Sequence, residues 1–226
     1  MAEAGRKIIT YIICFSLLVS LCACGEKSEE KTDVTLNKED TTLVLSIDET
    51  VGTHVVQIPE YHSKVQSGVV SELNQDIKEL LFPIYEQEGS EKEPQILTTI
   101  YDNDRYLQAV VQYVEYPLVG GNGDVTSYNY DRIKDKRVTL TDALILSQTT
   151  LDDVRQMVID AFLLTGKATE NETAIYGVTV DGFVLDEKDS CVFFGNIDLC
   201  FGNDTPWSYV YAYDFASGMV TVYDLQ

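Results

Sequence analysis

The sequence has few histidines and few basic residues, and both shortages exclude classes of function. His54 and His62 are the only histidines, too few for a multi-histidine zinc site. No serine or cysteine elbow accompanies them, so we assign both to surface or packing roles rather than to catalysis. The chain has 16 lysines and arginines against 37 aspartates and glutamates, a formal net charge of −21. Such a chain repels a phosphate backbone, and nucleic-acid binding is not expected.

The N-terminal apolar run, residues 8–21, is too short for a comfortable membrane span, and two basic residues precede it. This pattern is typical of a cleaved export signal. The run ends in Leu21-Cys22-Ala23-Cys24-Gly25, which resembles the bacterial lipoprotein signal. We therefore expect residues 1–23 to be removed and Cys24 to be acylated, which would anchor the protein on the outer side of the bacterial cell membrane. An ordinary secretory signal or an uncleaved anchor would also export the domain.

Residues 24–41 are rich in Glu, Lys, Ser, Thr and Asp and predict a disordered tether. Removal of residues 1–23 would leave 14 basic and 36 acidic residues, a net charge of −22. This acidity has two interpretations. It keeps an exported protein soluble, which is the simpler explanation, or it attracts a basic partner.

The rest of the chain, residues 42–226, predicts one α+β domain in which antiparallel sheet or sheets are packed by two amphipathic helices. The first helix is expected at 65–82 and ends at Pro83. The second follows a cap at Thr149 or Thr150 and ends at Gly166. Their expected buried stripes are Val65, Val69, Val70, Leu73, Ile77, Leu80 and Leu81, and Leu151, Val154, Met157, Val158, Ala161 and Phe162.

Strands are predicted where β-branched and aromatic residues alternate with polar ones between turn formers. They are expected at 42–47, 54–58, 95–101, 107–116, 125–131 and 138–140. Pro59 should end the second of these strands, and Thr141 and Asp142 should cap a short helix at 143–146. In the C-terminal third, three hairpins are predicted, with turns at Asp181-Gly182, Gly195-Asn196 and Ser217-Gly218.

Two loops resemble ligand sites only in part. Asp102-Asn103-Asp104 could be half of a calcium loop, but the glycine and the distal glutamate of such loops are missing, so a tight turn is expected. No Lys-Ser/Thr pair follows the glycines of Gly120-Gly121-Asn122-Gly123, so we interpret this segment as a link between strands. No metal, cofactor or catalytic residue is predicted.

Cys191 and Cys200 flank the second of the predicted hairpins and could face each other across it. In an exported protein such a pair could form a disulfide. The alternative is two small buried residues that stay reduced.

Two motifs suggest a family. The segments Ser127-Tyr128-Asn129-Tyr130-Asp131 and Val138-Thr139-Leu140-Thr141-Asp142-Ala143-Leu144 resemble the extracytoplasmic domain of the lysozyme-sensing anti-sigma factor RsiV and its lipoprotein relatives. The resemblance covers about residues 43–224 and implies extracellular ligand binding, with a basic wall-active protein such as lysozyme as one candidate. The glycine loop here lacks the histidine often found in that family. A leader and lipid anchor stand where RsiV has a sigma-binding segment and a membrane helix, which disfavours a sigma-sequestering role.

Three functions remain open from the sequence. The first is a membrane-anchored, non-catalytic binding domain for a basic extracellular protein or a cell-wall component. The second is a wall-directed hydrolase with paired carboxylates, whose test is a spatial separation. The third is a structural envelope lipoprotein, which would expose a large apolar patch.

Overall fold

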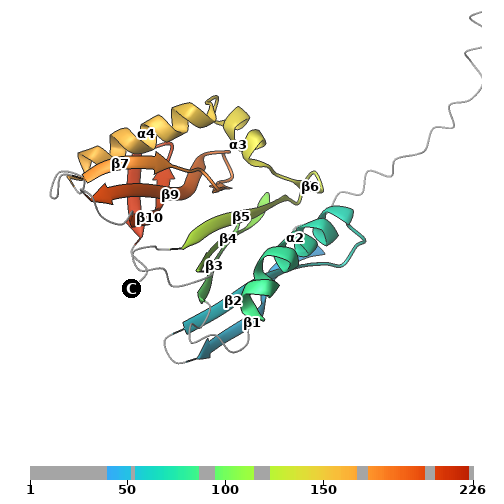
Figure 1. The fold of residues 1–226 in the computed structure, drawn as a ribbon. Coiled ribbons are helices and arrows are strands. Elements are labelled where there is room, and N and C mark those ends of the chain that lie inside the picture. Colours follow the sequence, from blue (N-terminus) through green and yellow to red (C-terminus); the bar gives the residue numbers. More distant parts are fainter. Residues whose placement is uncertain are drawn as a thin grey trace, which may run out of the picture. The chain divides into compact units, whose positions relative to one another are not determined.

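The computed structural model describes residues 40–51, 54–86, 95–114, 123–166, 173–201 and 207–223 (Figure 1). Within these ranges the chain forms three helices and eleven strands in two sheets, and the predicted α+β class is confirmed. The expected leader, the acylation site Cys24, the tether up to residue 39 and the glycine loop up to residue 122 lie outside the described residues.

The first six strands form one sheet, here called sheet A, in the order β1-β2-β3-β4-β5-β6. These strands are β1 (Thr41–Val51), β2 (His54–Ser63), β3 (Gln95–Asp102), β4 (Tyr106–Val114), β5 (Asp124–Asp131) and β6 (Lys136–Arg137). Neighbouring strands are antiparallel except β2 and β3, which are parallel and meet at one residue pair, Val56 with Ile96. β3 is therefore fully paired along its edge with β4 and covered by β2 only near its start.

The other five strands form sheet B, in which β9 is central. Its strands are β7 (Thr173–Val178), β8 (Gly182–Leu185), β9 (Cys191–Phe201), β10 (Trp207–Asp214) and β11 (Met219–Tyr223). β10 pairs with one edge of β9, and β11 pairs with β10. β7 and β8 pair one after the other with the opposite edge of β9.

The helices cover the outer faces of the two sheets (Figure 1). α2 (Gly68–Tyr85) buries Val70, Leu73, Ile77, Leu81 and Ile84 against sheet A. α3 (Leu140–Leu146) and α4 (Leu151–Leu164) pack on sheet B, where Val154, Val158 and Phe162 are buried. The inner faces of the sheets meet in a smaller apolar cluster that includes Val110, Val125, Val184, Phe194 and Val210. The layers are therefore helix, sheet, sheet, helices.

Both prolines that were expected to end an element lie inside one. β2 continues through Pro59 because the register with β1 shifts between Leu45 and Ile47, and a proline, which has no N–H, is tolerated at such an irregularity. α2 continues through Pro83 to Tyr85, so the proline removes one bond of the helical ladder, and the helix ends within a turn of it. The N–H of Glu86 still donates to the carbonyl of Phe82, at 2.8 Å.

The strand predicted at 138–140 is wrong, and so is the cap that was assigned after it. Leu140 is the first residue of α3, and Thr139 is its N-cap. Asp142 is the third helical residue and completes a capping box with Thr139. For α4, the cap at Thr150 is confirmed.

The end of α4 at Gly166 is also confirmed, because this glycine has the positive φ of 76° that helix termination favours. One member of the predicted stripe of α4 is wrong. Met157 is 37% exposed.

Two of the three predicted hairpins are also wrong. No turn forms at Asp181-Gly182 because β7 and β8 both pair with β9 rather than with each other. Gly195-Asn196 lies inside β9, where a Cβ on Gly195 would be 2.1 Å from the carbonyl oxygen of Thr179. This glycine therefore permits a close approach of two backbones, not a turn. The hairpin about Ser217-Gly218 is confirmed, between β10 and β11.

The proposed disulfide between Cys191 and Cys200 does not fit this fold. Both residues lie on the single strand β9, at its start and near its end. Nine residues of extended strand separate them by about 30 Å, far beyond the reach of a disulfide. Cys191 is a buried free thiol whose pKa is raised to about 12 by burial.

Candidate functional site: a cleft lined by aspartates

A cleft with a volume of about 630 Å³ lies between the two sheets' loops in the described part of the chain. Three segments form it: the end of β3, the β8–β9 hairpin, and the turn after β10. Its lining residues are Ile100, Tyr101, Asp102, Asn103, Val184, Leu185, Asp186, Ser190, Val192, Asp214 and Ala216. The lining thus combines apolar side chains with three aspartates and includes no lysine or arginine.

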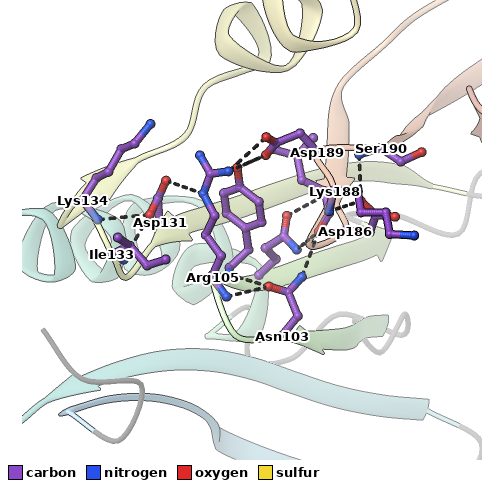
Figure 2. A network of polar contacts seen from close by, with 12 residues as sticks. Asn103, Arg105, Asp131, Ile133, Lys134, Asp186, Lys188, Asp189 and Ser190 are labelled. Carbon is purple, nitrogen blue, oxygen red and sulfur yellow. Dashed lines mark hydrogen bonds and ion pairs between the residues drawn. The ribbon is translucent and has the colours of Figure 1, made fainter.

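Asp186 shapes the β8–β9 loop that forms one wall of the cleft. Its Oδ1 accepts hydrogen bonds from the backbone N–H groups of Lys188 and Ser190, both at 2.8 Å. Its own N–H donates to the carbonyl of Ser190, at 2.9 Å. Asp189 takes a positive φ of 63° within this loop. The loop is therefore fixed in a tight conformation that directs the Asp189 side chain toward sheet A (Figure 2).

Arg105, in the turn between β3 and β4, ties this loop to sheet A (Figure 2). Its guanidinium donates to Asp189 at 2.8 Å and to Asp131, at the end of β5, at 3.1 Å. It also lies 4.6 Å from the ring centre of Tyr106, whose hydroxyl donates to Asp189. Burial, with the bond to Asp189, raises the pKa of Tyr106, so this hydroxyl stays protonated and remains a donor. The network holds the cleft wall in place by charge-assisted bonds.

Asp131 has two further bonds that hold it in the network. Its side chain is only 3% exposed, and its Oδ1 accepts from the N–H groups of Ile133 and Lys134, both at 3.1 Å. Burial acts to lower the pKa of Arg105, but the bond to Asp131 and the nearby carboxylates raise it overall, so the arginine stays charged. Arg105 bonds to two carboxylates and Asp131 accepts three bonds, so neither charge of this partly buried pair is left unpaired.

Two amides of sheet A hold β8 beside the cleft. The Gln108 side chain is fully buried and makes a two-way pair with Leu185, donating to its carbonyl and accepting from its N–H, each at 2.8 Å. Asn103 donates to the same carbonyl at 3.1 Å, while its Oδ1 accepts from the N–H groups of Arg105 and Tyr106. These side chains replace the neighbouring strand that β8 lacks on this edge.

The other two aspartates of the lining are also held by bonds. Asp214 accepts from the hydroxyl of Ser217 at 2.8 Å and from the N–H of Ala216 at 2.9 Å. The bond to Ser217 is the main reason that the pKa of Asp214 is lowered. Asp102 forms an ion pair with Arg132. The rim of the cleft therefore presents fixed carboxylates, and Asp214 stays ionised well below neutral pH.

The lining carries carboxylates and apolar side chains but no histidine or cysteine. Among the described residues, no group of three or more His, Cys, Asp and Glu side chains is arranged to hold a metal ion. His62 is exposed, lies 3.5 Å from Glu60 on β2 and is not part of the lining. The side chain of His54 lies outside what the structure describes. The cleft can attract cations and basic groups, and its apolar residues can pack against a partner.

Of the residues that form this site, only the turn at Asp102-Asn103-Asp104 was predicted from the sequence. A turn closed by its own side chains was expected there, and Asn103 accepts from two backbone N–H groups of the turn. Arg105, Asp186, Asp189 and Gln108 were not predicted. The one available signal was the polar segment 186–190 between two apolar runs, which the wrongly placed hairpins concealed.

No family model matches the chain, and no curated protein sequence does either. The resemblance to the RsiV extracytoplasmic domain thus remains a prediction from two motifs. Among the described residues, no helix has the length and hydropathy needed to span a membrane.

Proposed function

We propose that this protein is a lipoprotein anchored through Cys24 outside the cell membrane, and that its domain binds a basic extracellular protein without catalysing a reaction. The observation that carries the proposal is the cleft of about 630 Å³, whose lining includes Asp102, Asp186 and Asp214 and no basic residue. The net charge of −21 supports it, because long-range attraction speeds the encounter with a basic partner. A lysozyme is the partner that the RsiV resemblance suggests.

The anchor can be tested by itself. In cells that express the full-length chain, the wild-type protein should fractionate with the membrane and carry acyl chains on Cys24 by mass spectrometry. Cys24→Ala should move the domain to the soluble exported fraction, since burial of acyl methylene groups supplies the membrane affinity. Wild-type protein without acylation would contradict the anchor and leave the binding role to its own test.

Binding can be tested with a basic lysozyme as the probe, at low and at physiological salt. We expect the full-length lipoprotein in detergent to bind, with weaker binding at the higher salt because counterions screen the attraction. The triple variant Asp102→Asn, Asp186→Asn, Asp214→Asn should bind about tenfold more weakly, because three exposed charges at about 0.5 kcal/mol each amount to about 1.5 kcal/mol. Asparagine keeps an oxygen that can accept the bonds of the two loops.

A matched control removes three acidic charges elsewhere. Glu72 and Glu79 are exposed on α2, and Asp160 is exposed on α4. The variant Glu72→Gln, Glu79→Gln, Asp160→Asn should therefore retain most of the affinity. An equal loss in both variants would show that net charge matters and the cleft does not. Absence of lysozyme binding at both salt concentrations would refute this partner.

A wall-directed glycoside hydrolase is the second candidate, and the three carboxylates that line one cleft favour it. Such an enzyme needs one carboxyl group with a raised pKa to act as the acid. Asp214 has the opposite shift, and Asp186 is engaged by the backbone of its own loop. Release of soluble fragments from purified peptidoglycan by the wild type, and not by Asp102→Asn, would favour the hydrolase.

A further inference from the structure

The strand β3 has an edge that the rest of sheet A leaves open beside the cleft. β4 pairs with β3 along all eight residues, whereas β2 pairs with it only where Val56 meets Ile96. Beyond that point, Gln57 still bonds to β3: its side-chain oxygen accepts from the N–H of Thr98 at 3.3 Å, and its carbonyl accepts from the Thr98 hydroxyl at 2.6 Å. No other described strand pairs with this edge of β3.

The alternation of an antiparallel strand identifies which backbone groups are exposed there. Successive residues turn their N–H and C=O groups alternately toward the partner strand and away from it. The N–H of Thr98 points away from β4, since it bonds to Gln57. Ile100 and Asp102 share this parity and turn their N–H and C=O groups to the open edge. The N–H of Asn103, of the opposite parity, donates back to Tyr106 across the turn.

β2 does not cover these groups because, beyond Gln57, the edge that it turns toward β3 is bonded to α2 instead. The N–H and C=O of Tyr61 are both bonded to the side chain of Asn74, each at 2.8 Å. At Tyr61, where β2 would have to pair with the end of β3, its backbone is bonded to α2 instead. An open edge of this kind is uncommon in native sheets, because it can pair with another chain.

The open edge forms part of the cleft. Ile100 and Tyr101 point to opposite faces of β3, yet both line the cleft together with Asp102, so the cleft runs along the strand edge. A second cavity, of about 170 Å³, is lined by Tyr101 together with Leu97, Thr99, Val110, Phe194 and Tyr223. A strand laid on this edge would place every second side chain between the two sheets. Side chains on its other face would lie on the side of β3 that carries Asp102, while Asp186 and Asp214 line the same cleft from sheet B.

We propose that β3 binds an extended, basic segment of a protein partner as an added strand, bonded to the backbones of Ile100 and Asp102. Main-chain bonds at a sheet edge give affinity, and the pockets for alternate side chains give selectivity. The proposal rests on the proposed function in taking the ligand of the cleft to be a protein. A second copy of this chain is disfavoured as the occupant by the net charge of −21.

The test is amide hydrogen exchange, followed residue by residue by NMR on the full-length lipoprotein in detergent. The probe is a blocked eight-residue peptide that alternates lysine and valine. The control peptide has the same sequence with every second backbone nitrogen methylated, which removes the donors along one edge and keeps the charge. At saturating peptide, exchange at Ile100 and Asp102 should slow at least tenfold, with little change at Thr99 and Tyr101, which already face β4. The methylated peptide should not slow exchange at Ile100 or Asp102.

Each other outcome overturns the proposal. Slow exchange at Ile100 and Asp102 in the monomer without peptide would mean that another part of the chain already covers the edge. Slow exchange that depends on protein concentration would identify a second copy as the occupant. Equal binding of both peptides, or binding without slower exchange at Ile100 and Asp102, would mean that charge alone drives the interaction. If lysozyme binds the protein without this protection, the proposed function stands and the strand addition fails.

Discussion

Two strand edges lie beside the cleft, and they differ in whether side chains satisfy their backbone hydrogen-bonding groups. The outer edge of β8 is closed by side chains of sheet A: the N–H of Phe183 donates to Ser127 at 2.9 Å, and Leu185 is paired with Gln108. The outer edge of β3, at Ile100 and Asp102, has no such cover among the described residues. Since a few amide and hydroxyl groups suffice to close an edge, the one left open beside the cleft is the better candidate for an intermolecular contact.

The largest expected effect comes from opening the closed edge. Gln108→Leu keeps the size of the buried side chain but leaves the N–H of Leu185 without its acceptor. We expect the free energy of unfolding to fall by about 2 to 3 kcal/mol, the cost of an unsatisfied buried polar group with the loss of a second bond. Urea denaturation measures the loss. Hydrogen exchange at the Leu185 amide should accelerate by more than the loss of global stability explains. An exchange rate that changes no more than the rest of the domain would show that the Gln108 pair does not close the edge.

Ser127→Ala opens the same edge at the N–H of Phe183 and also removes the acceptor of the Asn129 side-chain amide, which donates to the hydroxyl at 2.9 Å. The expected loss of stability is about 1 to 1.5 kcal/mol. The packing should change little, because the Cβ of Ser127, which lies close to Gly182, is retained. Ser127→Thr keeps the hydroxyl and is the control for its chemistry. If alanine and threonine have the same effect, then the close contact with Gly182 matters more than the hydrogen bond.

This difference between edges could not be predicted from the sequence, whereas the local features could. Thr150 and Gly166 act within one turn of α4, and Asn103 bonds its own turn, so neighbouring residues suffice to predict them. Gly195 resembles a turn glycine in sequence, but a side chain is excluded there by the carbonyl of Thr179, which is distant in sequence. That single error divided β9 into a hairpin and produced the false disulfide.

The candidate site depends on contacts of the same long-range kind. Arg105 and Asp189 are 84 residues apart, and Gln108 and Leu185 are 77 apart. No spacing in the sequence indicates which of the many aspartates face the cleft. The α+β class was predictable because it depends only on the periodicity of apolar residues, which is a local property.

Side chains also close the exposed N-terminus of α3, and this closure should depend on pH. The bond from Lys136, with those from Thr139, lowers the pKa of Asp142 to about 2, below its ordinary value of 3.8. The contribution of Asp142 is therefore fully present above about pH 4 and is lost as the pH falls through about 2. It should amount to about 1 kcal/mol after allowance for its partial exposure. Asp142→Asn should lower stability at pH 6 and reduce its slope between pH 4 and 2; a parallel pH profile would contradict this role.

The smallest expected effect on stability comes from placing a charge at the open edge. Ile100 is 37% exposed, so Ile100→Lys should change the free energy of unfolding by no more than about 0.5 kcal/mol, because the long stem can cover the same surface with its charge in water. A lysine on a strand edge repels a basic strand, and the alternating lysine-valine peptide should bind at least tenfold more weakly. Ile100→Glu adds a charge of opposite sign at the same place and should retain binding. If both variants bind the peptide as the wild type does, the edge of β3 is not the contact, and its openness has no functional meaning.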